Sequence, residues 1–162
     1  MSNLIREQVL EIINTARQQG ERPNFDGANL HGVDLSQADF SLASFMGADL
    51  SRANLIGINL SEANLLQANL RWVKLRGAKL VGANLSGADL TGADLEGADL
   101  TGADLLIAEM FEAKLNEAIL AGAVPLNPKI EAKIGHLLCQ YPIKSQKVNQ
   151  RSLYLIFFSL LL

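Results

Sequence analysis

Few side chains in this 162-residue chain have the type and spacing that catalysis or metal binding requires. The two histidines, His31 and His136, lie far apart, and neither has a second ligand at the spacing of a metal site. Cys139 is the one cysteine, and on its expected helix a buried structural thiol is favoured over a nucleophile. The glycines recur inside short repeats rather than before a helix, so they form no phosphate-binding loop. We therefore expect no enzyme activity, no metal and no cofactor.

The acidic residues are the remaining candidates, since paired carboxylates can act as general acid and base. Many of them recur at one position, directly before a large apolar residue, as in Asp89-Leu90 and Asp94-Leu95. Short polar side chains at such regular positions bond the backbone of turns. The spacing therefore predicts that these carboxylates are hydrated and bond the backbone on the outside of turns. Whether they also come together in pairs depends on the elements that carry them.

The middle of the chain is a tandem repeat of five residues. From Phe25 to Leu120 every fifth residue is large and apolar, namely sixteen Leu, three Phe and Met110. Two residues before each of these stands Ala in sixteen units of the twenty, and another apolar residue in the other four. Those four residues are Pro23, Val33, Ile58 and Val73.

Neither a helix nor a straight strand can bury this pattern on one side. Five residues of α-helix turn through about 140°, which would spread the Leu positions around the whole circumference. On a strand, positions five apart point to opposite faces. Only a chain that bends by a quarter turn in each unit brings all Leu and Ala side chains to one interior. Four units then close a coil of about twenty residues, and coils stack about 4.8 Å apart.

The unit is clearest in the segment Ala88-Asp89-Leu90-Thr91-Gly92, which continues in register as Ala93 to Gly97. This unit resembles the pentapeptide repeat family, and the resemblance covers about 100 of the 162 residues. It implies an all-β solenoid, a right-handed quadrilateral β-helix of about five coils over residues 23–122. Some members of the family mimic a DNA duplex and bind DNA gyrase, which confers quinolone resistance.

Both ends are expected to carry short α-helical caps. Residues 1–22 show helical spacing at Ile5, Val9, Ile12, Ile13 and Ala16, with Ser2 as N-cap and with Gly20 and Pro23 as stops. In residues 123–162, Asn127 and Pro128 indicate a second helix start. In some relatives a C-terminal helix pairs two molecules end to end, so the resemblance also implies a possible homodimer.

The apolar tail Leu153–Leu162 has three open explanations. It packs on the coil or on a partner subunit, it contacts a membrane surface with the help of Lys144, Lys147 and Arg151, or it is a non-native reading-frame remnant. The tail is too short to span a bilayer.

Charge and cysteine content limit the partners and the compartment. Residues 23–122 hold thirteen acids and six bases, a net −7, whereas residues 123–162 hold one acid and five bases, a net +4. The acidic middle argues against direct nucleic-acid binding. A single cysteine and a start without the layout of a secretion signal predict a cytoplasmic protein.

Departures from the repeat identify candidate partner-binding residues. Residues twenty apart should share a face, so Met46, Leu66, Leu106 and Ile107 are expected to be exposed on one face as an apolar strip. On the next face Arg52 is expected to stack on Trp72, with Arg71 beside it and Phe111 further along.

These candidates favour a non-catalytic scaffold or regulator that presents flat faces to a protein partner. DNA mimicry directed at gyrase is an alternative, although Arg52, Arg71, Lys74, Arg76 and Lys79 would interrupt a negative surface. A membrane-associated structural role is a third possibility, and it depends on the apolar tail.

Overall fold

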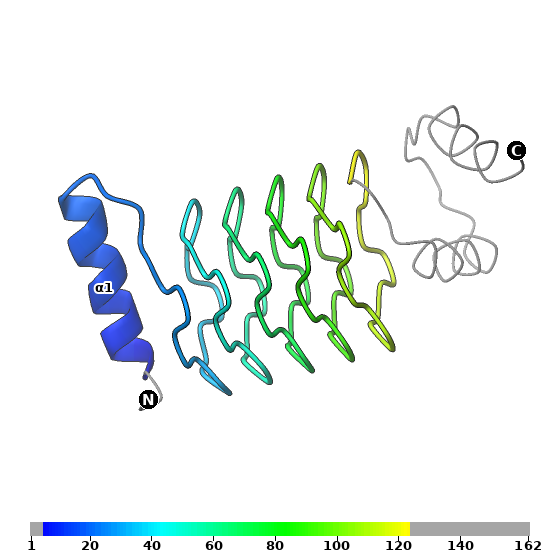
Figure 1. The fold of residues 1–162 in the computed structure, drawn as a ribbon, viewed down its shortest axis with the longest axis horizontal. Coiled ribbons are helices and arrows are strands. Elements are labelled where there is room, and N and C mark those ends of the chain that lie inside the picture. The colour runs from blue at the N-terminus through cyan, green and yellow to red at the C-terminus, as the bar shows by residue number, and fades with distance from the viewer. Residues whose placement is uncertain (1–4, 124–162) are drawn as a thin grey trace, which may run out of the picture.

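The fold is a stack of coils closed at one end by a helix, as a computed structural model of the chain shows (Figure 1). The structure describes residues 5–123. Helix α1, Arg6–Gln18, comes first, and the coils follow it along one axis. The expected C-terminal cap helix and the apolar tail lie outside the described residues.

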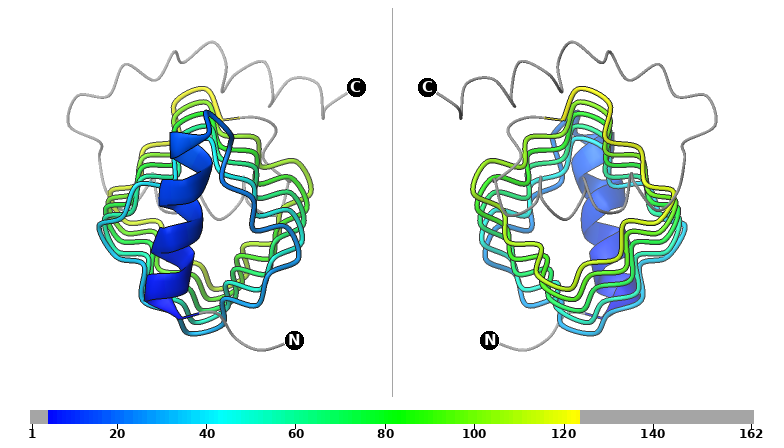
Figure 2. Two further views of the ribbon diagram at one scale, coloured as in Figure 1. Left: turned by 90° about the vertical axis from the view of Figure 1, so that its left-hand side faces the viewer. Right: turned by 90° about the vertical axis from the view of Figure 1, so that its right-hand side faces the viewer.

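Parallel bridges join residues that are twenty apart, from Asn24↔Ser44 to Asp99↔Ile119. Each five-residue unit contributes one bridged residue, the one before the large apolar residue, so four units make one coil. Viewed along the axis, the coils superpose on a four-sided outline (Figure 2). Within residues 5–123 the β structure consists of these isolated bridges, and the turns between them leave no room for a continuous strand.

Each corner is a four-residue turn. In the first unit the N–H of Ala28 donates to the carbonyl of Phe25 at 3.0 Å, and the intervening Gly27 has φ +65°. A hydrogen bond across four residues with a left-handed third residue is the geometry of a type II turn. The same positive φ recurs at every fifth residue, which gives the quarter turn that the repeat predicts.

Backbone hydrogen bonds hold neighbouring coils in register. Leu30 N–H donates to the Asp49 carbonyl at 2.7 Å, and Gly32 N–H donates to the Ser51 carbonyl at 2.9 Å. In the opposite direction, Asp49 N–H donates to the Ala28 carbonyl at 2.9 Å. Most units repeat these three bonds, so the polar backbone of the interior coils is satisfied between coils.

The interior is filled by the two apolar columns, as the sequence predicts. Leu70, Leu75 and Ala78 are at most 1% exposed, and the other central members of both columns are equally buried. At the N-terminal end Phe25, Phe40 and Phe45 widen the column. The ring centroids of Phe25 and Phe45 lie 5.1 Å apart in a stacked arrangement, and Phe40 packs against both rings.

Helix α1 lies across the open end of the first coil (Figure 2). Val9 and Ile13 are buried in the same core as the coil columns. Ile5 and Ile12, expected on the apolar stripe, are exposed instead, because the face of the helix that packs on the coil carries Val9, Leu10 and Ile13.

The ends of α1 differ in part from the expectation. Ile5, rather than Ser2, holds the N-cap position, and its N–H donates to Gln8 Oε1 at 3.1 Å. Gln8 thus supplies from inside the helix the bond that a polar cap would supply from outside. The predicted stop at Gly20 is confirmed, since Gly20 has φ +72° just after the C-cap residue Gln19.

Candidate interaction surface

In most units an Asn or Asp stands directly before the large apolar residue, and its side chain bonds the turn that follows. Asp49 Oδ1 accepts the N–H of Ser51 at 3.0 Å and its hydroxyl at 2.6 Å. Asn69 Oδ1 accepts the N–H of Arg71 at 3.2 Å, and its amide donates to Asp49 Oδ1 at 3.0 Å. These side chains form columns along the solenoid, and their structural role is the one that the spacing predicts.

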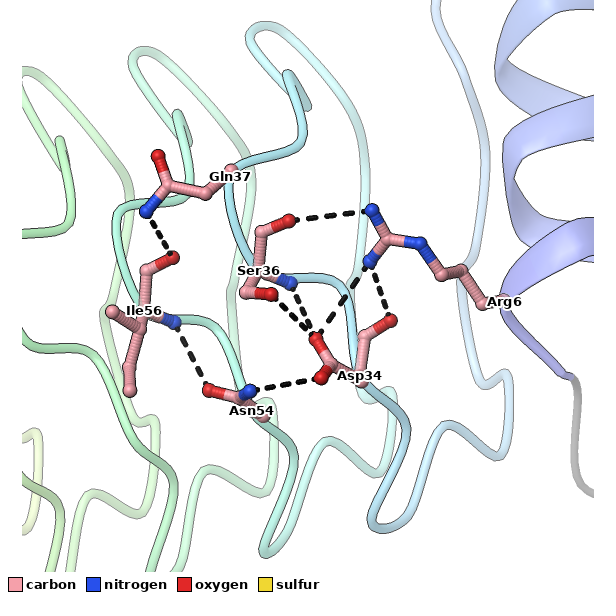
Figure 3. Close-up of polar contacts among 6 residues, drawn as sticks. All are labelled: Arg6, Asp34, Ser36, Gln37, Asn54 and Ile56. Carbon is pink, nitrogen blue, oxygen red and sulfur yellow. Dashed lines mark hydrogen bonds and ion pairs between the residues drawn. The ribbon is translucent and has the colours of Figure 1, made fainter.

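Three carboxyl groups in these columns have lowered pKa values. Hydrogen bonds from the hydroxyl and then the N–H of Ser36 lower the pKa of Asp34 to about 2, and the Asn54 amide and the Arg6 charge add to this (Figure 3). For Asp39 and Asp89, desolvation opposes the shift. The pKa of both still falls, because Ser41 and Arg17 stabilise the Asp39 anion and Thr91 and Arg71 stabilise the Asp89 anion.

Of the histidines and the cysteine that the sequence offered for chemistry, the described residues include only His31. His31 Nδ1 lies 2.8 Å from Ser51 Oγ on the next coil. Within residues 5–123, no three His, Cys, Asp or Glu side chains are grouped as a metal site would require. His136 and Cys139 lie outside the described residues. No helix in the described range has both the length and the apolar character needed to cross a bilayer.

Most of the candidate partner-binding residues are exposed. The exposed fractions are 43% for Met46, 46% for Leu106, 67% for Ile107, 48% for Trp72 and 71% for Phe111. Arg52 and Arg71 are exposed as well.

Leu66 was expected to be exposed, but it is partly buried. It lies at mid-rod in one column between Met46 and Ser86, and neighbours about 4.8 Å away on both sides cover much of its side chain. Ser86 interrupts the apolar column between Leu66 and Leu106, so the expected strip is discontinuous. The sequence reasoning also missed Leu42, which is 41% exposed. The sequence feature that could have identified Leu42 is a large apolar residue at the corner position, where many other units carry Gly.

Trp72 occupies this left-handed corner position, with φ +57°. Its six-membered ring lies against Gly92 on the next coil, with Cδ2 only 2.6 Å from the position that a Gly92 Cβ would take. The indole therefore leans away from Arg52 on the preceding coil, and the expected stacking on Arg52 is replaced by contact with Gly92. Only Gly at residue 92 leaves room for this ring.

The basic residues around Trp72 fall into two groups. Arg71 Nη1 lies 2.8 Å from Asp89 Oδ2, and Arg76 Nη2 lies 3.0 Å from Glu96 Oε1, so both arginines are paired with the next coil. Arg52 and Lys74 are exposed, and neither lies within 4 Å of a carboxylate oxygen in the described part of the chain. Two cations that form no ion pair within residues 5–123 therefore stand near Trp72, Arg52 at the same corner of the preceding coil and Lys74 two residues further along the chain.

Comparison with known proteins identifies the repeat. The family model of pentapeptide repeats matches the chain in eight copies, over residues 24–61, 43–80 and 68–105. Together these ranges cover residues 24–105, which is half of the chain. Comparison with curated proteins gives no significant match.

Solved structures of the same kind are similar to this chain. A pentapeptide repeat protein from Nostoc PCC 7120 is 31% identical, with 70% of this chain and 98% of that one covered and a TM-score of 0.38. Rfr23 from the cyanobacterium Cyanothece 51142 is 27% identical, with 70% and 97% covered and a TM-score of 0.32.

HetL, a pentapeptide repeat protein involved in heterocyst differentiation regulation in Nostoc sp. strain PCC 7120, is 32% identical, with 64% and 57% covered and a TM-score of 0.23. The family match, the identity to the first Nostoc protein and the twenty-residue coil agree with one another. This chain belongs to the pentapeptide repeat family and folds as a right-handed β-helix solenoid.

Proposed function

We propose that this protein is a non-catalytic scaffold that binds a protein partner through a surface centred on Trp72. We name this surface, formed by Arg52, Trp72 and Lys74, the central surface. The observation that carries the proposal is an indole that is 48% exposed and is held at a left-handed corner where Gly would be relaxed. Nine corners of the described solenoid hold a residue other than Gly, and Trp72 is the one aromatic residue among them, so the side chain rather than the strain distinguishes this corner.

The environment of Trp72 suits an interface anchor. Exposed Trp and Arg dominate the binding energy of many interfaces. The ring already lies against Gly92, so binding would immobilise little additional side-chain freedom.

Charge indicates the kind of partner. The repeats carry a net −7, yet Arg52 and Lys74 beside Trp72 have no carboxylate within 4 Å among residues 5–123. These two cations would pair with carboxylates of a partner, while the acidic remainder of the rod would repel a polyanion such as nucleic acid. The central surface therefore fits an acidic protein segment that carries an apolar or aromatic residue for the indole.

Affinity capture from the native host with matched variants tests this function. Trp72→Gly removes the indole and the strain of a positive φ at a residue with a side chain. The variant should therefore fold normally and no longer bind the partner. Gln67→Gly is the control, because Gln67 is exposed, has φ +56° and lies against Gly87 as Trp72 lies against Gly92. Capture of the same proteins by both variants, at the level of the unchanged chain, would exclude the central surface as the binding site.

Gyrase-directed DNA mimicry gains no support from the geometry. Asp89, Asp94 and Glu96 would belong to a duplex-like negative surface, but each lies within 4 Å of Arg71 or Arg76. A supercoiling assay decides the matter, since a DNA mimic inhibits gyrase at micromolar concentration and the scaffold proposed here does not.

A further inference from the structure

A second exposed surface lies at the C-terminal end of the described solenoid. We propose that residues 144–162 of this chain dock on it and cover it in the same molecule. This surface, called here the distal patch, consists of Leu106, Ile107, Glu109, Phe111 and Glu112 on the last coil and is separate from the central surface.

The distal patch exposes large apolar side chains close together in sequence. Ile107 is 67% exposed and Phe111 is 71% exposed, the two highest values among the large apolar residues of the solenoid. Ile107 also has φ +51°, a conformation that a β-branched residue rarely adopts. A strained and exposed isoleucine at one corner and an exposed phenylalanine at the next are not explained by the stability of the coil, and they indicate a surface that is covered by another segment.

Charge complementarity identifies the segment. Glu109 and Glu112 are exposed, and neither has a Lys or Arg nitrogen within 4 Å in the described residues. The segment from Lys144 to Leu162 begins with Lys144, Lys147 and Arg151 and ends with ten mostly apolar residues. It therefore offers cations for the two glutamates and apolar side chains for the rest of the distal patch.

The chain that follows Ala123 is long enough to bring Lys144 to the distal patch. Ala123 follows the last coil, and residues 124–143 provide twenty residues before Lys144. Even at the 1.5 Å per residue of a helix they span about 30 Å. A coil of twenty residues has a contour of at most about 70 Å, and its outline has four sides of five residues each, so no two of its points are more than about 25 Å apart. The distal patch lies well inside this limit, and a second copy is not required by distance.

Disulfide trapping in the full chain tests the proposal. With Cys139→Ser as background, Ile107→Cys and Leu155→Cys would be combined and oxidised at low micromolar concentration. The expected product is a cross-linked monomer, seen as a mobility shift on a non-reducing gel and as a linked peptide by mass spectrometry. The control pairs Asn116→Cys with Leu155→Cys, because Asn116 is exposed on the same coil about half a turn away. The control should react at least tenfold more slowly.

Three results would overturn the proposal. Equal rates for both pairs would show that the segment samples the coil without preference, and cross-linked dimers would show that a second copy supplies it. The third is binding of the full chain to vesicles of phosphatidylcholine and phosphatidylserine that is unaffected by Ile107→Ser with Phe111→Ser. Docking predicts that this double variant releases the segment and increases vesicle binding. Trp72→Gly should leave the trapping rate unchanged, so the result is independent of the central surface.

Discussion

The left-handed corner residue is the position at which the units of this solenoid differ most in side-chain type while the backbone conformation stays the same. Gly occupies it in units such as those of Gly92 and Gly97, whereas Trp72, Ile107 and Leu42 occupy it elsewhere. A non-glycine L-residue in this conformation costs on the order of 1 kcal/mol. Because the corner conformation is the same with either residue type, the coil does not require a large apolar side chain there.

Gly92→Ala tests the fixed position of the Trp72 indole. The new Cβ would overlap the ring, so the indole must rotate into solvent. Gly97→Ala is the matched control, since Gly97 has a similar φ of +66° and no atom within 4 Å of its would-be Cβ. Both variants should lose about 1 kcal/mol from backbone strain. Only Gly92→Ala should shift the emission of the single tryptophan to longer wavelength, and equal spectra would contradict the ring position.

At the scale of elements, α1 supplies hydrogen bonds to the first coil that a preceding coil supplies to each later coil. In the second coil the carbonyls of Asn54 and Ile56 accept N–H groups from the coil before, at 2.9 and 3.0 Å. The equivalent carbonyls of the first coil belong to Asp34 and Ser36, and the Arg6 guanidinium donates to both, at 2.8 and 3.4 Å (Figure 3).

Arg17 donates in the same way to the Asp39 carbonyl at 3.0 Å. The helix thus covers the apolar end of the core and also satisfies carbonyls at the exposed edge of the coil.

Removing both arginines should loosen α1. Arg6→Ala with Arg17→Ala deletes the donors to the first-coil carbonyls, and we expect a loss of about 1–2 kcal/mol because both guanidinium groups are partly exposed. Urea denaturation gives the loss, and amide hydrogen exchange should rise first in α1. Arg22→Ala is the control, since Arg22 forms no ion pair within residues 5–123. An equal effect of the control would show that general charge, rather than edge pairing, is responsible.

The same junction gives a defined pH dependence. The pKa of Asp34 is about 2 in the folded chain and 3.8 without structure. As pH falls from about 4 to 2, the unfolded chain takes up a proton at this site before the folded chain does, so stability falls with pH in this window. Asp34→Asn removes this contribution.

The urea midpoints of the two chains should therefore differ most at pH 5 and converge towards pH 2. A difference that stays constant between pH 5 and 2 would contradict the lowered pKa.

For the whole molecule, the five-residue period was sufficient to predict the interior. No regular helix or strand buries every fifth residue, so the coil and its two apolar columns follow from geometry alone, and the burial of Leu70 and Ala78 confirms them. The repeat period does not fix the orientation of the surface side chains, because the rotamer of each one depends on the residue at the same position of the neighbouring coil. Trp72 leans towards Gly92 rather than Arg52 because Gly92 lacks a Cβ. The sequence did contain this information, because Gly92 stands twenty residues after Trp72 and therefore at the same corner of the next coil.

The narrow interior makes stability depend on each column position, and two leucines test this. Leu70 is fully buried at mid-rod, whereas Leu42 is 41% exposed at a corner. Leu70→Ala leaves a cavity between coils that cannot collapse, because hydrogen bonds fix the coil spacing, and it should cost about 2–5 kcal/mol.

Leu42→Ala makes the same chemical change and should cost less than about 1 kcal/mol. Urea denaturation followed by circular dichroism measures both variants. Since each coil contacts only its neighbours, the Leu70 cavity weakens two interfaces at once and should also broaden the transition. Equal losses for the two variants would mean that the leucine column does not form the core.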